Sequence, residues 1–451
     1  MHAEDTAVAA SLNRLDDLLQ KARKAGADAA DAVLVEAVSI AHAQRLGAVE
    51  KLERSEGADL GLRVFVGQRQ ACVSTSDLSA DALEGLVDRA LAMAQNVPDD
   101  PYCGLAQRRD LARDWPALDS DDPAEPAAED LIARARTCEE AARAVEGITN
   151  AEGAEAGWSR GTVALAASNG FRGGYTTSSH SVGCAVLAGE GTAMERDYAF
   201  HTAVHGADLE DPAAVGRLAG ERTVQRLKPR RAKTGSYPVV FHPRVANSLL
   251  RHLAAAINGA AIARGTSFLK DRLDTAVFAP GITVIDDPHR PRGLKSKPFD
   301  AEGLPNQCRE IIADGRLTTW ILSLASARQL GLRSTGHAAR GTGAPPGPAT
   351  TNLYMAPGSQ SPDSLMADIT EGFYVTEMLG QGVNLVTGDY SRGAAGFWIE
   401  NGALADPVSE VTLAGNLKEM FARLTPADDL EFRYGTDAPT LRVDAMTLAG
   451  Q

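Results

Sequence analysis

The chain has 451 residues, of which 44% are hydrophobic and 23% charged, the ordinary composition of a globular protein with about three domains. Its 45 basic and 59 acidic residues give a formal net charge of −14, and so acidic a chain repels phosphate backbones. We therefore expect no nucleic-acid partner. The one dense basic cluster, residues 226–233, fits a helix end followed by a connector, where positive side chains are favoured.

The thiols and the apolar runs bear on where the protein works. The five cysteines are odd in number and form no CxxC pair, which is typical of reduced thiols in a cytosolic protein. The first residues, 1–19, carry acids and a helical pattern, so no secretory signal is expected. The longest apolar runs are far shorter than the roughly 20 residues of a membrane span. We expect a cytoplasmic protein with no membrane partner.

Helix and strand patterns alternate in the first quarter of the chain. Leucines at helical spacing predict an amphipathic helix over residues 5–25. Alternating apolar residues predict a strand over 32–40, and 61–75 has the pattern of a hairpin with a central glycine turn. A second amphipathic helix is predicted over 77–96. Residues 1–112 are therefore expected to form a mixed α/β N-terminal domain.

A second set of elements follows an acidic, proline-rich stretch, residues 116–130, which indicates a linker or exposed loop before a helix. Residues 157–208 have the pattern of successive strands, with Asn169-Gly170 as a strong hairpin signal. Asp211-Pro212 provides an N-cap and a first-turn proline for a further helix. These features predict a central α+β domain over 113–230, built on an antiparallel hairpin meander.

The remaining half of the chain, residues 231–451, is expected to form a strand-rich C-terminal domain. A short strand over 237–241 precedes a helix over 243–259 with inward-facing leucines. Residues 341–348 predict a flexible or extended stretch, and 366–379 a helix or strand pair. The predicted fold class is thus α+β, in a chain of several parts.

Two histidines have the spacing of a metal-binding pair. His201 and His205 are four residues apart, which places two imidazoles on one face of a helix. The flanking residues fit a strand better, and no glutamate follows His201 to act as a general base. Two polar residues on a strand face are therefore the favoured interpretation, with a hydrolytic site left open.

Carboxylates are densest at Asp286-Asp287 and at Asp300 and Glu302. Paired acids can hold a hard cation or hydrolyse a glycosidic bond, but acids in loops are more often solvated turn residues, which we favour here. The sequence has no GxSxG nucleophile motif and no phosphate-binding loop. Composition and spacing alone therefore predict no self-evident active site.

Five sequence strings, in this order along the chain, resemble the PmbA/TldE branch of the TldD/PmbA family, which is also described as modulators of DNA gyrase. The resemblance covers nearly the whole chain. The strings are RSEGADLGLRVFVGQRQACVSTSDLS (54–79), IDDPHRPRGLKSKPFDAEGLP (285–305), LASARQLGLRSTGHA (324–338), TNLYMAPGS (351–359) and GDYSRGAAGFWIENGALADPVSEVTLAGNL (388–417).

The resemblance implies that the zinc site of the family is absent from this chain. TldD-type subunits carry an HExxxH helix and a later cysteine, which together leave one zinc position open for water. In the matching helix, Arg251 stands at the first ligand, His252 at the base and Ala256 at the second ligand, and no cysteine follows Cys308. We expect no catalytic residue, metal or cofactor in this chain, and zinc in a TldD-like partner.

The function that the resemblance implies is that of a non-catalytic subunit of a heteromeric TldD/TldE zinc metallopeptidase, acting on unstructured or modified peptides. Its partners would be a TldD-like paralogous subunit and a peptide substrate, with a homodimer left open for the chain alone. In the glycine-rich segment, Asp389, Arg392 and Trp398 are candidate substrate or partner contacts, since arginine and tryptophan are frequent at interface hot spots.

Two alternatives remain open at this stage. The chain could act as a stand-alone regulatory or binding protein of the gyrase-modulator kind, without a TldD-like subunit. It could instead be an independent hydrolase whose site, built from His201 and His205 or from Asp286-Asp287, is not recognisable in the sequence. The first alternative predicts a protein partner of another kind, and the second predicts activity from this chain alone.

Overall fold

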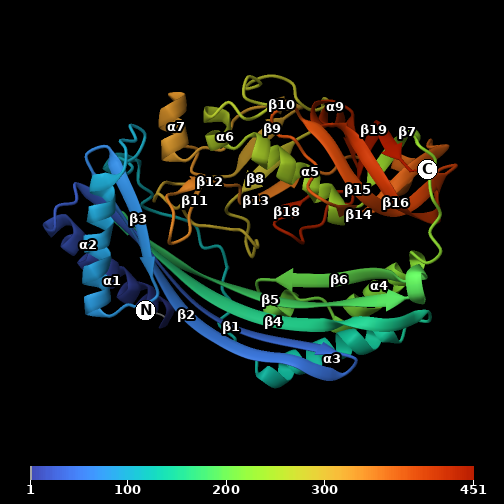
Figure 1. The fold of residues 1–451 in the computed structure, drawn as a ribbon, viewed down its shortest axis with the longest axis horizontal. Coiled ribbons are helices and arrows are strands. Elements are labelled where there is room, and N and C mark those ends of the chain that lie inside the picture. The colour runs from blue at the N-terminus through green and yellow to red at the C-terminus, as the bar shows by residue number, and fades with distance from the viewer. Residues whose placement is uncertain (1–2, 451) are drawn as a thin grey trace.

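The computed structural model describes residues 3–450, and its helices and strands confirm the expected α+β class. The chain forms two halves. One long, curved sheet is built by roughly the first half, and a strand-rich body built by the second half lies across its concave side (Figure 1). In the described part of the chain, no helix is both long enough and apolar enough to cross a membrane.

The first half is built on a six-stranded antiparallel sheet with the order β3-β2-β1-β4-β5-β6. Strand β1 pairs with β4 over fourteen positions, from Asp31 opposite Ala167 to Gln44 opposite Ala154, so residues before and after 112 contribute to the same sheet. The strands are β1 (Ala29–Arg45), β2 (Ala48–Val66), β3 (Arg69–Thr75), β4 (Ile148–Ala167), β5 (Arg172–Ala188) and β6 (Glu195–Ala203).

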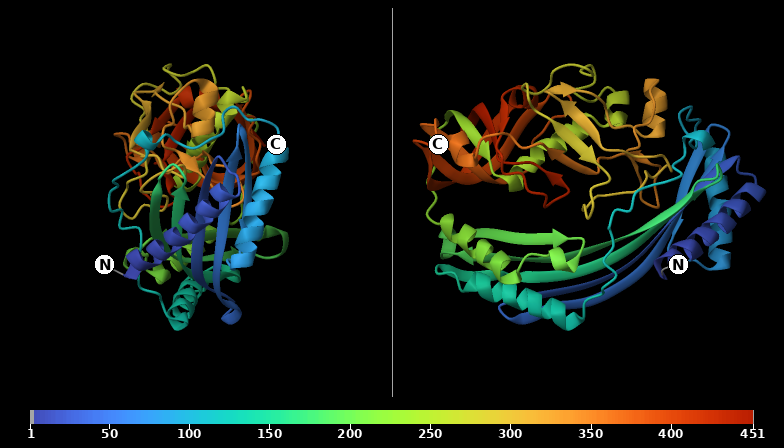
Figure 2. Two further views of the ribbon diagram at one scale, coloured as in Figure 1. Left: turned by 90° about the vertical axis from the view of Figure 1, so that its left-hand side faces the viewer. Right: turned by 180° about the vertical axis from the view of Figure 1, so that it is seen from behind.

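Two pairs of helices cover this sheet. Helices α1 (Ala3–Lys24) and α2 (Ala80–Asn96) pack on one end through a leucine-rich core, and α3 (Ala128–Arg143) and α4 (Pro212–Gln225) pack side by side on the other end (Figure 2). Helix α2 begins at Ala80 because the Ser79 hydroxyl accepts a hydrogen bond from the Ala82 amide.

The second half packs two sheets around one helix. A six-stranded sheet has the order β16-β15-β14-β7-β19-β17, and a five-stranded sheet the order β10-β9-β8-β13-β18. Helix α5 (Pro243–Ala256) packs into the core between them through Leu249, Leu250 and Leu253, each at most 1% exposed. This is the largest core cluster of the described residues, and it fixes the position of α5.

The bounds of the remaining elements follow. The helices are α6 (Gly259–Ala263), α7 (Leu324–Leu330), α8 (Pro362–Met366) and α9 (Leu417–Ala422). The strands are β7 (Gly235–Phe241), β8 (Val284–Asp287), β9 (Arg309–Ala313), β10 (Arg316–Leu317), β11 (Ala338–Ala339), β12 (Gly347–Pro348), β13 (Asn352–Met355), β14 (Glu371–Leu379), β15 (Asp389–Glu400), β16 (Ala403–Asn416), β17 (Leu424–Pro426), β18 (Thr436–Asp437) and β19 (Leu441–Ala449).

One expected helix differs from the structure. The single helix expected over 243–259 is two helices, because the Asn258 side chain accepts a hydrogen bond from the Ala260 amide and caps α6 as a new helix. The glycine-rich stretch 341–348, which was expected to be flexible or extended, bends at residues 342–344 and ends in β12, which pairs with β11. Its Thr342 backbone also lies so close to Gly61 on β2 that a Cβ at Gly61 would be 2.2 Å from the Thr342 oxygen.

A candidate binding cavity between the two halves

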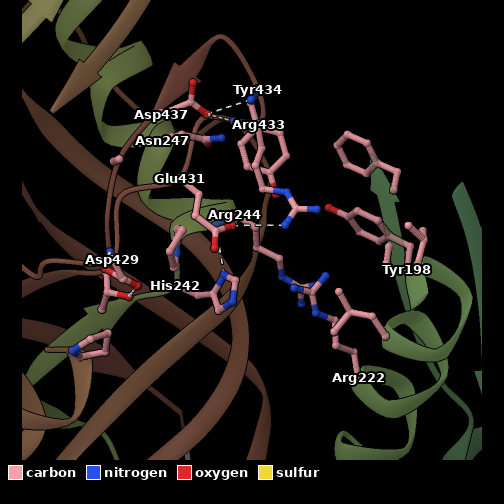
Figure 3. A pocket seen from close by; sticks show the side chains of 18 of the residues that line it. Tyr198, Arg222, His242, Arg244, Asn247, Asp429, Glu431, Arg433, Tyr434 and Asp437 are labelled. Atoms are coloured by element: carbon pink, nitrogen blue, oxygen red, sulfur yellow. Dashed lines mark hydrogen bonds and ion pairs between the residues drawn. The ribbon is translucent and has the colours of Figure 1, made fainter. Parts of the chain in front are cut away.

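A cavity of about 320 Å³ opens where the two halves of the chain meet. One wall comes from β6 and α4 of the first half, and the other from the start of α5 and from residues 429–440 of the second half (Figure 3). Ten of its residues are labelled in the figure: Tyr198, Arg222, His242, Arg244, Asn247, Asp429, Glu431, Arg433, Tyr434 and Asp437.

Buried ion pairs join the two walls at one side of this cavity. Arg244, in the first turn of α5, makes two hydrogen bonds of 2.7 and 2.9 Å to the Asp197 carboxylate on β6, and a third to the Thr376 carbonyl. Arg226, just after α4, lies 3.5 Å from Asp197 and 2.6 Å from Glu377. Burial alone raises the pKa of Asp197, but these arginines outweigh it and lower that pKa.

A neutral histidine lies at the start of α5. His242 is its N-cap, and its Nδ1 atom accepts a hydrogen bond of 3.1 Å from the Arg244 amide. Burial, helped by the nearby charges of Arg222 and Arg244, lowers the pKa of His242 to about 3. The ring is therefore neutral at physiological pH, and since Nδ1 accepts, its one hydrogen is on Nε2.

Aromatic rings line the middle of the cavity. The ring centroids of Phe200 on β6 and Tyr434 in the second half lie 5.7 Å apart, so this contact also crosses between the halves. Tyr374 on β14 is in the same wall, and burial raises its pKa to about 12. The aromatic rings offer an apolar surface with hydroxyl groups at its edge.

The acidic groups of the second wall already have partners. Arg433 pairs with Glu210 at 2.7 Å and with Glu431 at 3.3 Å. Asp437 accepts hydrogen bonds from the Arg433 and Tyr434 amides, which fixes the bend of this segment, and burial raises its pKa. Asp429 accepts from the amide and the hydroxyl of Thr440 at 2.8 and 2.7 Å.

The three degenerate zinc-motif positions point to different surroundings. Arg251 lines the cavity and donates a hydrogen bond to Asn247 at 3.1 Å, whereas Ala256 is fully buried in the core. The His252 ring lies 6.0 Å from the Tyr390 ring, and burial lowers its pKa to about 4. An arginine is always charged and an alanine has no donor atom, so these residues do not fit a zinc ion. Within residues 3–450 no three His, Cys, Asp or Glu side chains are grouped to hold a metal ion.

The predicted substrate or partner contacts lie away from the cavity wall. Asp389 is exposed at the start of β15 and accepts hydrogen bonds from Thr387 and Asn416. Arg392 donates to the Gly380 carbonyl at 3.0 Å. Trp398 is only 6% exposed and packs in the core, with Arg230 over its ring at 5.2 Å. A contact role for these residues remains a prediction.

The two histidines with metal-like spacing bind separate partners. His201 is on β6, and its Nδ1 accepts a hydrogen bond of 3.1 Å from the Glu210 amide. His205 follows the end of that strand, and its Nε2 lies 3.1 Å from the Asp119 carbonyl oxygen. The expected strand therefore includes only the first of the two.

Of the four acids that were expected to be solvated turn residues, Asp286, Asp300 and Glu302 are buried, so that expectation was wrong for them, while Asp287 is half-buried. Asp286 is fully buried on β8, where it accepts hydrogen bonds from the amide and hydroxyl of Thr351 and lies 3.1 Å from His337 Nε2. Asp300 accepts from three backbone amides. Burial raises the pKa of both Asp300 and Glu302. These carboxylates organise loops through internal hydrogen bonds and do not face solvent.

Sequence reasoning did not single out the arginines and tyrosines of the cavity. Arg222, Arg244 and Arg433 come from segments that are far apart in the sequence, and no motif links them. The one local signal is the N-cap and proline at the start of α5, where His242 precedes Pro243. It predicts a helix start and says nothing about the wall opposite.

Comparisons with known proteins place this architecture in a family. Models of the PmbA/TldA metallopeptidase domain 1, central domain and C-terminal domain match residues 30–94, 121–227 and 234–450. The metalloprotease PmbA of Escherichia coli O157:H7 is 39% identical over 94% of this chain and 93% of its own length. Proteins described as TldD homologues match about half of the chain.

Two crystal structures have the same fold over nearly their whole length. One is described as a modulator of DNA gyrase from Bacteroides thetaiotaomicron, with a TM-score of 0.89, 26% identity, and coverage of 97% of this chain and 98% of that one. The other is TldE from Thermococcus kodakarensis, with a TM-score of 0.85, 17% identity, and coverage of 97% and 100%; at this identity the likeness concerns the fold alone. The chain belongs to the PmbA/TldD metallopeptidase family.

Proposed function

We propose that this chain is the non-catalytic subunit of a two-subunit zinc metallopeptidase, in which a TldD-like paralogue carries the zinc and cleaves unstructured or modified peptides. The observation that carries this proposal is the chemistry of α5. Where the resemblance places two zinc ligands and a base, this helix has Arg251, Ala256 and His252. A positively charged guanidinium at the first position would repel a zinc ion instead of binding it.

The cavity between the halves supports a role in peptide contact. It has an aromatic surface, hydrogen-bond donors and a size suited to a few side chains, and these are features that suit peptide binding and require no reactive group. A cytoplasmic location is part of the proposal and is supported by the five cysteines, all within the described residues and all free thiols.

The test is a peptidase assay on an unstructured peptide, with this chain alone, the TldD-like subunit alone, and the mixture, each with and without a chelator. We expect activity in the mixture only, lost on chelation, and less than one equivalent of zinc per purified chain by elemental analysis. Activity from this chain alone, or a TldD-like subunit equally active without it, would contradict the proposal.

A matched pair of variants separates this proposal from an independent hydrolase. Replacing both His201 and His205 with alanine in this chain is expected to leave the activity of the mixture unchanged, because each histidine binds its own structural partner. Replacing the glutamate of the HExxxH helix in the TldD-like subunit is expected to abolish it. The reverse pattern would place the reacting groups in this chain.

A further inference from the structure

One positive charge in the cavity wall has no partner. Arg222, in the last turn of α4, makes no hydrogen bond or ion pair with any residue in the described part of the chain, although it is half-buried. Burial and the neighbouring charges of Arg244 and Arg433 lower its pKa. The other arginines of the wall have partners: Arg244 pairs with Asp197, Arg433 pairs with Glu210, and Arg251 donates a hydrogen bond to Asn247. Among the cavity arginines within residues 3–450, Arg222 is thus the one whose guanidinium makes no hydrogen bond.

Two neutral donors in the opposite wall are also unused. The hydrogen on His242 Nε2 has no acceptor among residues 3–450, because the ring uses Nδ1 to cap α5. The Tyr434 hydroxyl likewise has no hydrogen-bond partner among the described residues. These donors lack an acceptor, and a group with several oxygen atoms could accept from all of them. A negative charge on that group would also offset the repulsion between Arg222 and the neighbouring arginines.

The acids in the wall do not supply this missing acceptor. Glu210 and Glu431 are bonded to Arg433, Asp429 to Thr440, and Asp437 to backbone amides. Glu210 pairs across the cavity with Arg433, and the other three acids are used within the second wall, while Arg222 reaches the cavity from α4 in the first (Figure 3). An anion between the walls would accept from both halves of the chain.

We propose that this cavity binds an oxyanion, either a peptide C-terminal carboxylate or a phosphate, with Arg222 as its charged anchor and His242 and Tyr434 as neutral donors. The aromatic rings of Phe200 and Tyr198 next to these donors offer an apolar place for the group attached to the anion. A guanidinium with two free edges suits a two-oxygen anion, since its parallel N–H groups match the spacing of those oxygens. The inference concerns this chain alone and does not depend on a TldD-like partner.

The test is calorimetric titration of the purified full-length chain with two kinds of probe. The first is a short peptide ending in phenylalanine, as the free acid and as the C-terminal amide, and the second is inorganic phosphate. We expect the free acid to bind and the amide to bind at least about tenfold more weakly, because a hydrogen bond to a charged group is lost. Phosphate competing with the free acid would show that both use the same donors.

Variants identify the anchor. Arg222→Gln is expected to weaken binding of the free acid by about tenfold or more, and Tyr434→Phe, which removes only a hydroxyl, by about two- to tenfold. Arg217→Gln is the matched control, because Arg217 is an exposed arginine on the same helix outside the cavity wall. Thermal denaturation verifies that each variant is folded, and Tyr434→Phe carries the test if Arg222→Gln is not.

The outcomes separate the sources and can overturn the inference. Binding of the free acid over the amide supports a peptide carboxylate, and binding of phosphate with no effect of either peptide supports a phosphate ligand at the same donors. Three outcomes would each overturn the inference. The first is equal binding of the free acid and the amide with no binding of phosphate, and the second is no binding of any probe. The third is an Arg222→Gln variant that binds the free acid as well as Arg217→Gln does.

Discussion

The ion-paired group at Asp31 gives the sharpest stability prediction. Asp31 on β1 is 2% exposed and is paired with Arg63 on β2 and, at 2.6 Å, with Arg340, which follows β11 in the second half of the chain. Burial alone raises the pKa of Asp31, but the two guanidinium groups outweigh it and hold that pKa below its usual value. This carboxylate is therefore the shared partner of two buried cations.

Replacing Asp31 with asparagine removes the negative charge and keeps the shape. The side chains of Arg63 and Arg340 are 4% and 1% exposed, so two cations would be left in a buried site without a counter-charge. Breaking a buried pair by removing one partner costs about 3–5 kcal/mol. Because Arg340 reaches across from the second half, we expect the loss to loosen the junction between the halves as well as the sheet.

The assay is urea denaturation followed by circular dichroism, comparing the free energy of unfolding of Asp31→Asn with that of the parent chain. Asp16→Asn is the matched control: it removes the partner of Arg172 at 3.1 Å, but both side chains are 43% exposed, so a loss of about 0–1 kcal/mol is expected. If Asp31→Asn destabilises the protein no more than Asp16→Asn, then the buried group does not depend on its charge and the reasoning is refuted.

Three further predictions concern other sites. The pKa of His242 is about 3 in the folded chain and 6.5 in the unfolded chain, so the free energy of unfolding should fall by up to about 5 kcal/mol as the pH drops through this window. His242→Asn keeps a capping side chain but cannot titrate. It should therefore flatten the decline of the urea midpoint between about pH 7 and pH 4. Gly216→Ala should lower the melting temperature, because its Cβ would lie 2.0 Å from the Cys138 carbonyl oxygen where α3 meets α4. Gly85→Ala has open space around it and should stabilise the protein by about 0.5–1 kcal/mol. A similar effect of both variants would contradict the packing argument. Trp398→Ala should cost about 3–5 kcal/mol through core packing, and unchanged stability with lost partner binding would instead identify a contact residue.

Local chemistry by itself determined several elements of this protein. Ser79 before α2 and Asp211-Pro212 before α4 mark helix starts, because capping depends only on residues within one turn. Asn169-Gly170 marks the turn between β4 and β5 for the same reason, with Gly170 at a φ of 100°. The lack of zinc ligands on α5 is likewise readable from the sequence, once the resemblance places the motif.

Long-range packing decided what local patterns could not. The first part of β2, Ala48 to Gly57, is mostly polar and is exposed on both faces, and its few apolar residues do not alternate. The segment is a strand because it pairs with β1. Asp286 was expected in solvent, but the hydroxyl and amide of Thr351, 65 positions away, hold it inside.

Of all the features described, the cavity is the one that depends most on the tertiary structure. Its anchor Arg222, its capping His242 and its Tyr434 belong to three separate segments, and buried ion pairs and an aromatic contact join the two walls. The pair of Asp31 with Arg340 spans 309 positions of the sequence. A sequence pattern shows which side chains share a helix face or a strand. Which distant segments line the same cavity is decided by burial and charge pairing over the whole chain.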